Sequence, residues 1–416
     1  MNTKKLFFFA IAALGLAACS NDEVVQTNAT SEANEISFRP LATGMTRAAD
    51  EHFNVANDQF AATAFHKGTT SGAYFDNITF KTADGTAFNS QSSKHYWPSG
   101  YNLDFYAYAP LSSEVGGSGS AAVTRSAYNT FVVTPGTDVP NQPDFVYAVT
   151  KNWGKKKTAE TWEAPDGHRI GGGATGITIN FRHAESKVAF KLANTNTNLK
   201  ITVGNVTIGN LRGSETFTWN GVTDGTSATS AADANTDGKY TSGTLTYLNG
   251  TWTATSAQTS TYTVTMESAA SYNIFNGIVA AKNLYSSNPA SNYDMILIPQ
   301  ALNVATTYAS SSAGAAFNGA NIQIQIKIQN AATDDYILGD AEAFVTAMWP
   351  LTALTWLPGH KYTYTVDLAS GGYNLTNVEG TDENLDPVLT ASEIVFVSVT
   401  VDDWSEAAGG VYNTGL

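Results

Sequence analysis

The sequence has little cysteine and little charge. One residue of the 416 is Cys, and charged residues make up 14 % of the chain. A single Cys excludes an internal disulfide and a cysteine-rich zinc module. Lys and Arg together number 22 against 36 Asp and Glu, which gives a formal net charge of −14. No basic surface able to neutralise phosphates is expected, so we predict no nucleic-acid partner.

Signatures of catalysis and of metal binding are also scarce. The six His residues form no H-E-x-x-H pair, no G-x-S-x-G string occurs, and the glycines at 171–173 lack the Lys of a phosphate-binding loop. Residues 233–238 resemble the opening of a calcium loop. Thr244 stands where a bidentate acid is needed, however, so a polar turn is the favoured interpretation. We therefore predict no enzyme, no cofactor and no metal.

Alternation of apolar and polar residues with a period of two is abundant. The clearest run has Ile at 322, 324, 326 and 328, and similar runs occupy 103–109, 177–181, 362–368 and 394–401. A period of two places one set of side chains on a single face of a strand. Hydrophobic residues make up 43 % of the chain, enough to fill a core. The predicted fold class is all-β, built from β-sandwiches, with one short helix over 340–348.

The N-terminus is typical of an exported protein. Lys4 and Lys5 precede an apolar run that ends at residue 18, too short for a membrane-spanning helix of about 20 residues. Residues 1–18 are therefore predicted to be a signal peptide. The run ends in LAAC, which resembles a bacterial lipobox and predicts lipidation of Cys19. The alternative is a chance Cys in an ordinary signal peptide.

The same patterns predict how the rest of the chain is divided. Residues 19–47 are expected to form a tether and a removable propeptide, in which Ile36 and Phe38 alternate with polar neighbours as in a short strand. Residues 48–180 are expected to form an N-terminal β-sandwich domain. Residues 181–416 are expected to form a C-terminal β-sandwich domain with a strand-like tail.

Five strings in the chain resemble the fimbrillin family, the pilins of type V fimbriae. They are TGMTRA at 43–48, YWP at 96–98 with LDFYAYAP at 103–110, FRHAESKV at 181–188, LIPQ at 297–300 and WLPGHKYTY at 356–364. Their shared order covers nearly the whole chain. One departure is Glu185, which stands where the family more usually has an apolar residue.

The resemblance implies two transthyretin-like (Greek-key) β-sandwich domains and a lipoprotein of the cell outer membrane that becomes part of a surface fimbrium, or pilus. It also implies that an Arg-specific surface protease cuts between Arg47 and Ala48. The cut would free a removable strand that contains Ile36, Phe38 and Leu41. Another fimbrial subunit would then fill the vacated groove, so that subunits polymerise by donor-strand exchange.

The donor strand is expected near the C-terminus. An exposed sheet edge pairs readily with a further strand, and alternate side chains of that strand set its register. Burying one valine contributes about 1.5–3 kcal/mol before ordering costs. The alternative is that the alternating run over 394–401 is an ordinary central strand of the C-terminal sandwich. The predicted donor residues are Val395, Val397, Val399 and Val401.

The leading prediction is thus a structural subunit of surface fimbriae that supports adhesion. One alternative within this class is a tip adhesin. A rival from another class is a glycan-binding surface lipoprotein that never polymerises, and either would have a host glycan or protein as its receptor. A glycoside hydrolase ranks third, because linear spacing cannot pair two carboxylates at the distance that such enzymes need.

Overall fold

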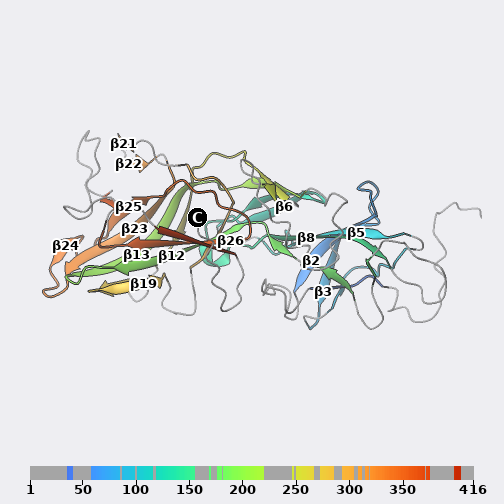
Figure 1. The fold of residues 1–416 in the computed structure, drawn as a ribbon, viewed down its shortest axis with the longest axis horizontal. Coiled ribbons are helices and arrows are strands. Elements are labelled where there is room, and N and C mark those ends of the chain that lie inside the picture. Colours follow the sequence, from blue (N-terminus) through green and yellow to red (C-terminus); the bar gives the residue numbers. More distant parts are fainter. Residues whose placement is uncertain are drawn as a thin grey trace, which may run out of the picture.

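The chain folds almost entirely into β-strands, and the ribbon in Figure 1 shows an elongated arrangement of them. The computed structural model describes residues 35–40, 58–84, 87–98, 101–115, 119–154, 168–169, 176–179, 181–219, 246–247, 250–266, 272–284, 293–303, 308–311, 314–317, 319–370, 372–374 and 398–403. Within these residues no helix is long and apolar enough to cross a membrane. The one short 3-10 helix among them, η3, covers Val139–Asn141.

The N-terminal sheet contains nine of the described strands. In spatial order they are β10 (Ile177–Ile179), β1 (Phe38–Pro40), β4 (Phe88–Ser90), β3 (Phe75–Thr82), β2 (Gln59–His66), β5 (Leu103–Ala109), β8 (Val146–Gly154) and β11 (Arg182–His183), with β9 (His168–Arg169) beside β8. The sheet curls so that β10 also approaches β8. Its concave face encloses the N-terminal core, which is rich in phenylalanine.

A second sheet, the bridging sheet, covers the outer face of β2, β5 and β8. Its strands are β15 (Thr246–Tyr247), β16 (Gly250–Thr253), β14 (Glu215–Thr218), β7 (Thr130–Thr134) and β6 (Ala122–Ala127). Tyr106 and Tyr108 of β5 share one buried cluster with Phe131 of β7 and with Trp219, the residue after β14. All seven residues of β5 are buried, since both of its faces are covered. The bridging sheet takes strands from both sides of residue 180, and the predicted domain boundary there stays a prediction.

The C-terminal sandwich packs two sheets face to face. The first contains β19 (Val279–Asn283), β12 (Ser186–Asn194), β26 (His360–Asp367) and β28 (Ser398–Asp403), with β20 (Met295–Leu297) beside β12. The second contains β17 (Ser260–Val264), β13 (Leu199–Leu211), β23 (Asn321–Asn330), β25 (Val345–Pro350) and β27 (Tyr373–Asn374), with β18 (Asn273–Asn276) beside β13 and β24 (Tyr336–Leu338) beside β23. A separate hairpin joins β21 (Tyr308–Ser311) to β22 (Gly314–Phe317).

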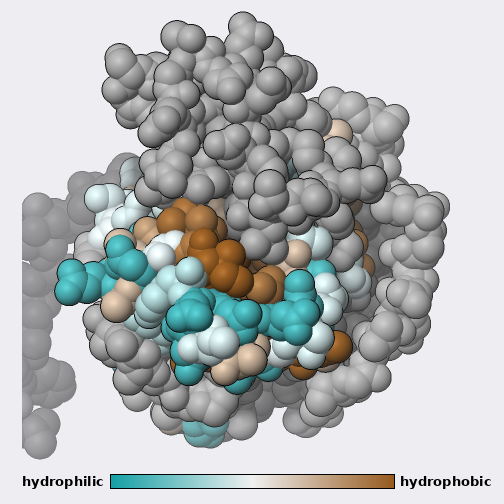
Figure 2. Space-filling model, turned by 90° about the vertical axis from the view of Figure 1, so that its left-hand side faces the viewer, coloured by the Kyte–Doolittle hydropathy of each residue, from teal (hydrophilic) through white to brown (hydrophobic). Residues whose placement is uncertain are grey.

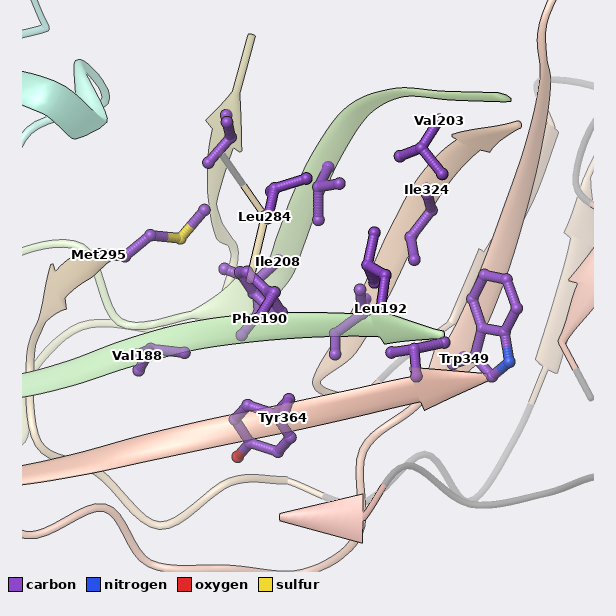
Figure 3. Close-up of a cluster of buried hydrophobic side chains, with 14 of the residues drawn as sticks. Val188, Phe190, Leu192, Val203, Ile208, Leu284, Met295, Ile324, Trp349 and Tyr364 are labelled. Carbon is purple, nitrogen blue, oxygen red and sulfur yellow. The ribbon is translucent and has the colours of Figure 1, made fainter. Parts of the chain in front are cut away.

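The core of this sandwich is formed by alternate side chains of facing strands (Figure 3). Phe190 and Leu192 of β12 lie opposite Ile208 of β13 and Ile324 of β23, and all four are buried. The polar residues between them lie toward the outside, as a period of two requires. The prediction of an all-β, sandwich-like fold is confirmed.

The prediction of a helix over 340–348 is wrong. Residues 345–350 form strand β25, which pairs with β23 along its whole length. Before it, the Asp340 carboxylate accepts the backbone N–H groups of Glu342 and Ala343, which fixes a turn instead of a helix start. Ladder pairing to β23 outweighs the weak local preference for a helix.

The end of the C-terminal sandwich that lies far from the N-terminal sheet is partly apolar. Figure 2 looks onto this end and shows hydrophobic atoms gathered between hydrophilic ones. Large hydrophobic side chains that are exposed on β18, on the turn after it and on β24 are Ile274, Ile278, Tyr336 and Ile337.

Candidate functional site

Strand β1 lies inside the N-terminal sheet, between β10 and β4. Phe38 pairs in parallel with Ile177 of β10 and antiparallel with Phe88 of β4. The backbone N–H of Ile36 donates to the carbonyl of His95 at 2.7 Å, and the N–H of Ile177 donates to the carbonyl of Ser37 at 2.7 Å. The strand is therefore hydrogen-bonded on both sides.

The two apolar side chains of this segment fill the N-terminal core. Ile36 and Phe38 are both 0 % exposed. The Phe38 ring meets the rings of Phe60, Phe80 and Phe105 edge to face, with centroid distances of 5.4, 4.7 and 5.3 Å. Aromatic pairs in this geometry add about 0.5–1.5 kcal/mol each beyond area burial. Removal of residues 35–40 would leave an apolar slot, called here the N-terminal groove, between β10 and β4.

Gly176 brings the wall of the N-terminal groove close to the strand backbone. Its φ is +95°, a left-handed conformation that favours glycine. A Cβ added there would lie 2.9 Å from the carbonyl carbon of Phe38 and 3.1 Å from the carbonyl oxygen of Ser37. The contact is with backbone atoms, so it depends on a strand being present and not on its side chains.

A charged pair lies at the N-terminal end of the segment that fills the N-terminal groove. The Lys94 ammonium lies 2.8 Å from the Glu35 carboxylate, with side-chain exposures of 54 % and 12 %. Glu35 also forms a β-bridge with Tyr96. Burial lowers the pKa of the neighbouring His95 imidazole, while the Glu35 charge opposes this. A half-exposed pair contributes little stability, at most about 1 kcal/mol, but it favours one register of the strand.

The covalent link from β1 to the next strand runs through residues 41–57. Leu41, Arg47 and Ala48 belong to this link and lie outside the described residues, as does Cys19. After a break in the link, β1 would be held to the sheet by hydrogen bonds and packing alone. The strand position of Phe38 and the burial of Ile36 rest on described residues, whereas the removal of both stays a prediction.

The predicted donor residues fall partly on β28. Val399 pairs with Tyr364 and Val401 with Tyr362, both on β26, and the two valines are half-buried against the C-terminal core. Among the described strands, β28 is the last of its sheet and pairs with β26 alone. Val395 and Val397 lie outside the described residues.

Comparison with protein families identifies the chain. The model of the fimbrillin-like family matches residues 46–404. The chain belongs to the fimbrillin-like family. The match begins just before Arg47 and ends at Trp404, so β1 precedes it in this fimbrillin-like protein.

Two solved structures show a similarity to this chain. A fimbrial protein from Bacteroides vulgatus shares 14 % identity, with a TM-score of 0.48 over 89 % of this chain and 100 % of that one. A candidate cell adhesion protein from Bacteroides uniformis also shares 14 % identity, with a TM-score of 0.42 over 89 % of this chain and 98 % of that one. No curated protein matches the fimbrillin-like chain.

Glu185 is a buried acid in this fimbrillin-like protein. It is 0 % exposed, and its Oε2 accepts the backbone N–H of Phe145 at 2.8 Å. Burial raises the pKa of the Glu185 carboxyl well above its ordinary value, and the charge of Asp144 adds to this. His183 Nδ1 lies 2.7 Å from Asp144 Oδ2. The described residues contain no group of three or more acids, His or Cys able to hold a metal ion.

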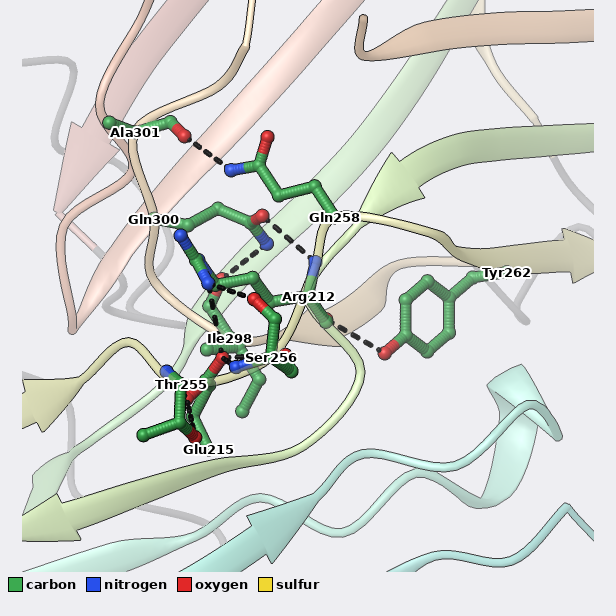
Figure 4. Close-up of polar contacts among 9 residues, drawn as sticks. All are labelled: Arg212, Glu215, Thr255, Ser256, Gln258, Tyr262, Ile298, Gln300 and Ala301. Carbon is green, nitrogen blue, oxygen red and sulfur yellow. Dashed lines mark hydrogen bonds and ion pairs between the residues drawn. The ribbon is translucent and has the colours of Figure 1, made fainter. Parts of the chain in front are cut away.

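A polar cluster joins the bridging sheet to the C-terminal sandwich (Figure 4). Glu215 accepts the backbone N–H groups of Thr255 and Ser256 at 2.7 and 2.9 Å and their hydroxyls at 3.0 and 2.6 Å. Burial alone would raise the pKa of the Glu215 carboxyl, but these hydrogen bonds outweigh it and lower the pKa. The backbone N–H of Arg212 donates to Gln300 Oε1 at 2.9 Å.

Neither Gly176 nor Lys94 was expected from the sequence as part of the site. Gly176 follows a glycine-rich stretch that suggests a linker, and a single surface Lys carries no signal of its own. The Glu35–Lys94 contact and the approach of Gly176 to β1 both depend on which distant segments are brought together.

Proposed function

We propose that this fimbrillin-like chain is a structural subunit of cell-surface fimbriae that polymerises by donor-strand exchange and supports adhesion. It is exported as a lipoprotein and anchored in the outer membrane through Cys19. An Arg-specific surface protease cuts between Arg47 and Ala48. The cut separates the lipidated leader, with β1, from the body of the subunit.

The burial of Ile36 and Phe38 between β10 and β4 carries this proposal. Once the link through residues 41–57 is cut, nothing covalent holds β1 in the N-terminal groove. Departure of β1 exposes two strand edges and the rings around Phe38. An apolar slot with open edges is a binding site for an extended strand, because backbone hydrogen bonds and buried side chains both reward its insertion.

The donor comes from the C-terminal tail of another subunit, in the region of Val395, Val397, Val399 and Val401. The tail can be released from its own sandwich more easily than an inner strand. Among the described strands β28 pairs with β26 alone, so release breaks one ladder, and Val399 and Val401 lose only partial burial. Exchange then replaces an edge contact within one subunit by a strand inserted into the core of the next.

The test is Arg47→Ala in cells that assemble the protein, with Thr46→Ala as the matched control. The wild type and the control should yield a surface form that begins at Ala48, and electron microscopy should show fimbriae. Arg47→Ala should leave a monomeric precursor that begins at lipidated Cys19. Normal fimbriae from Arg47→Ala would overturn the proposal. A lipidated wild-type surface form would instead favour the non-polymerising glycan-binding lipoprotein.

A further inference from the structure

The C-terminal tail repeats the sequence of the strand that fills the N-terminal groove. Residues 35–38 are Glu-Ile-Ser-Phe, and residues 393–396 are Glu-Ile-Val-Phe. Three of the four positions are identical. Between residues 375 and 416, Ile394 and Phe396 form the one pair in which an aliphatic residue is followed two positions later by an aromatic one.

The three shared residues are those whose side chains contact the N-terminal groove. Ile36 and Phe38 are fully buried, and Glu35 pairs with Lys94 at 2.8 Å. The position that differs, Ser37, is half-buried and lies on the other face of the strand. The repeat therefore preserves the side chains that the groove contacts and varies the one that it does not enclose.

We infer that residues 393–396 of a second copy bind in the N-terminal groove in the register of residues 35–38. This inference rests on the proposed function and specifies its donor. Ile394 takes the place of Ile36 and Phe396 that of Phe38, while Glu393 pairs with Lys94. Val395 and Val397 then lie on the opposite face, so the aromatic face of the tail enters the core and the valine face does not.

The rings around Phe38 explain why an aromatic residue is required. The rings of Phe60, Phe80 and Phe105 surround the Phe38 ring. Their centroids lie 5.4, 4.7 and 5.3 Å from its centroid. A valine in this position would leave part of the space empty, and a cavity in a close-packed core is costly. The strand atoms nearest to a Cβ at Gly176 are backbone atoms, so a change from Ser37 to Val395 does not disturb that approach.

The tail can also extend its hydrogen bonding further than the strand it replaces. β1 ends at Pro40, which has no N–H to donate to a neighbouring strand. The corresponding tail residue is Ser398, and residues 393–403 contain no proline. A longer ladder favours the tail over β1 once the leader is free to leave.

Strand β28 follows the tail segment closely, because it begins at Ser398. Ser398 pairs with Thr365, near the C-terminal end of β26. At that end the hydroxyl of Thr195, just after β12, donates a hydrogen bond to the carboxylate of Asp367. This end of the sandwich lies away from the N-terminal sheet (Figure 1). Because Phe396 is only two residues from Ser398, insertion into a neighbour requires β28 to leave β26.

The experiment uses the chain from residue 20 with a site for a sequence-specific protease placed between Arg47 and Ala48. After cleavage, polymer yield is measured by size-exclusion chromatography with light scattering. Ile394→Ala and Phe396→Ala should each lower the yield at least about tenfold, the change that a loss of 1.4 kcal/mol produces. Val395→Ala and Val397→Ala are matched controls on the opposite face and should polymerise within about twofold of the unmodified chain.

A disulfide between subunits tests the register directly. Cys19 is the one Cys of the chain, and the shortened protein that begins at residue 20 does not contain it. Lys94→Cys and Glu393→Cys therefore introduce the only thiols of that protein. Cleavage followed by oxidation should give a ladder of linked subunits, and neither single variant should give more than a dimer. Linked monomers without a ladder would show that the tail fills its own groove, which overturns binding to a second copy.

The outcomes separate the inference from the function on which it rests. Loss of polymer in Val395→Ala or Val397→Ala, with Phe396→Ala unaffected, would overturn the proposed register while donor-strand exchange stands. Absence of polymer from the cleaved unmodified chain would overturn the proposed function itself. Lys94→Glu and Glu393→Lys should each lower the polymer yield when made alone. The two changes together should restore the yield, and failure of this rescue would contradict the Glu393–Lys94 contact.

Discussion

The ring of Phe38 meets the ring of Phe80 edge to face, with 4.7 Å between centroids and an interplanar angle of 82°. Phe38 belongs to a strand of three residues, and Phe80 to a strand of eight. The short strand thus supplies a central side chain of the N-terminal core. A segment ahead of the predicted cleavage site completes the fold of the part that follows it.

Phe38→Ala in the uncleaved chain should destabilise the N-terminal core. Loss of a fully buried phenylalanine costs about 3–5 kcal/mol. Trp97 and Trp153 pack against this core, so their fluorescence reports its unfolding in urea. The transition should shift to clearly lower urea concentration. Ser37→Ala, on the other face of the same strand, should stay within about 0.5 kcal/mol of the unmodified chain. Equal stability of both variants would contradict the packing of β1.

Gly176→Ala should weaken the fit of any strand in the N-terminal groove. The added Cβ would meet the Phe38 backbone at 2.9 Å, and alanine is strained at a φ of +95°. We expect the uncleaved chain to lose about 1–3 kcal/mol and the cleaved chain to polymerise poorly. Gly68→Ala is the control, because its φ is also positive and nothing lies within 4 Å of the added Cβ. Similar losses in both variants would assign the effect to backbone strain alone.

Local pattern predicted strands where one face is buried and the other is not. In β23 the residues Ile322, Ile324 and Ile326 are buried and the Gln residues between them are half-buried, so the alternation is visible in the sequence. In β25 three successive residues, Ala347 to Trp349, are buried. Burial on both faces removes the period of two, so alternation does not indicate a strand in this segment.

The candidate site shows the same limit. Alternation and family resemblance together indicated a strand at Ile36 and Phe38. The neighbours of that strand, Ile177 in β10 and Phe88 in β4, are far away in the chain. Local periodicity says nothing about which strands pair, and Lys94 and Gly176 become part of the site through that pairing alone.

Glu185→Gln should change how stability depends on pH. Because burial raises the pKa of the Glu185 carboxyl in the folded protein, its favourable contribution is complete below the ordinary value of 4.5 and is lost as pH rises. Gln keeps an oxygen that can accept the Phe145 N–H and never ionises. The free energy of unfolding, measured in urea, should therefore be the same for the variant and the unmodified chain near pH 4. Toward pH 8 the variant should become increasingly more stable than the unmodified chain.

The control for Glu185→Gln is Glu342→Gln, an exposed acid whose loss alters the net charge equally. As a substitution of an exposed side chain, it should stay within about 0.5 kcal/mol of the unmodified chain. If Glu342→Gln reproduces the effect, net charge and not burial is the cause. If Glu185→Gln is less stable at pH 8, then the ionised carboxylate has a partner that stabilises it.

Glu215→Gln should act in the opposite direction. The Glu215 carboxylate accepts four hydrogen bonds from Thr255 and Ser256, which hold the loop between β16 and β17 against the bridging sheet. The amide nitrogen of Gln cannot accept hydrogen bonds, so donors lose their partner at about 1–3 kcal/mol. Since the pKa of Glu215 is lowered in the folded protein, its contribution is present above pH 4.5 and is lost as pH falls.

Urea unfolding of Glu215→Gln from pH 3 to pH 8 tests this sign. The variant should have a lower free energy of unfolding than the unmodified chain. This stability deficit should be largest at neutral pH and should shrink toward pH 3, where Glu215 itself becomes protonated. Glu342→Gln again controls for net charge. The Glu→Gln substitution is therefore expected to have opposite effects on stability at the two buried acids. Hydrogen bonds satisfy the Glu215 carboxylate, whereas the Glu185 carboxylate accepts one from the backbone N–H of Phe145. A deficit that does not change with pH would mean that shape, and not the charge of the carboxylate, holds the loop.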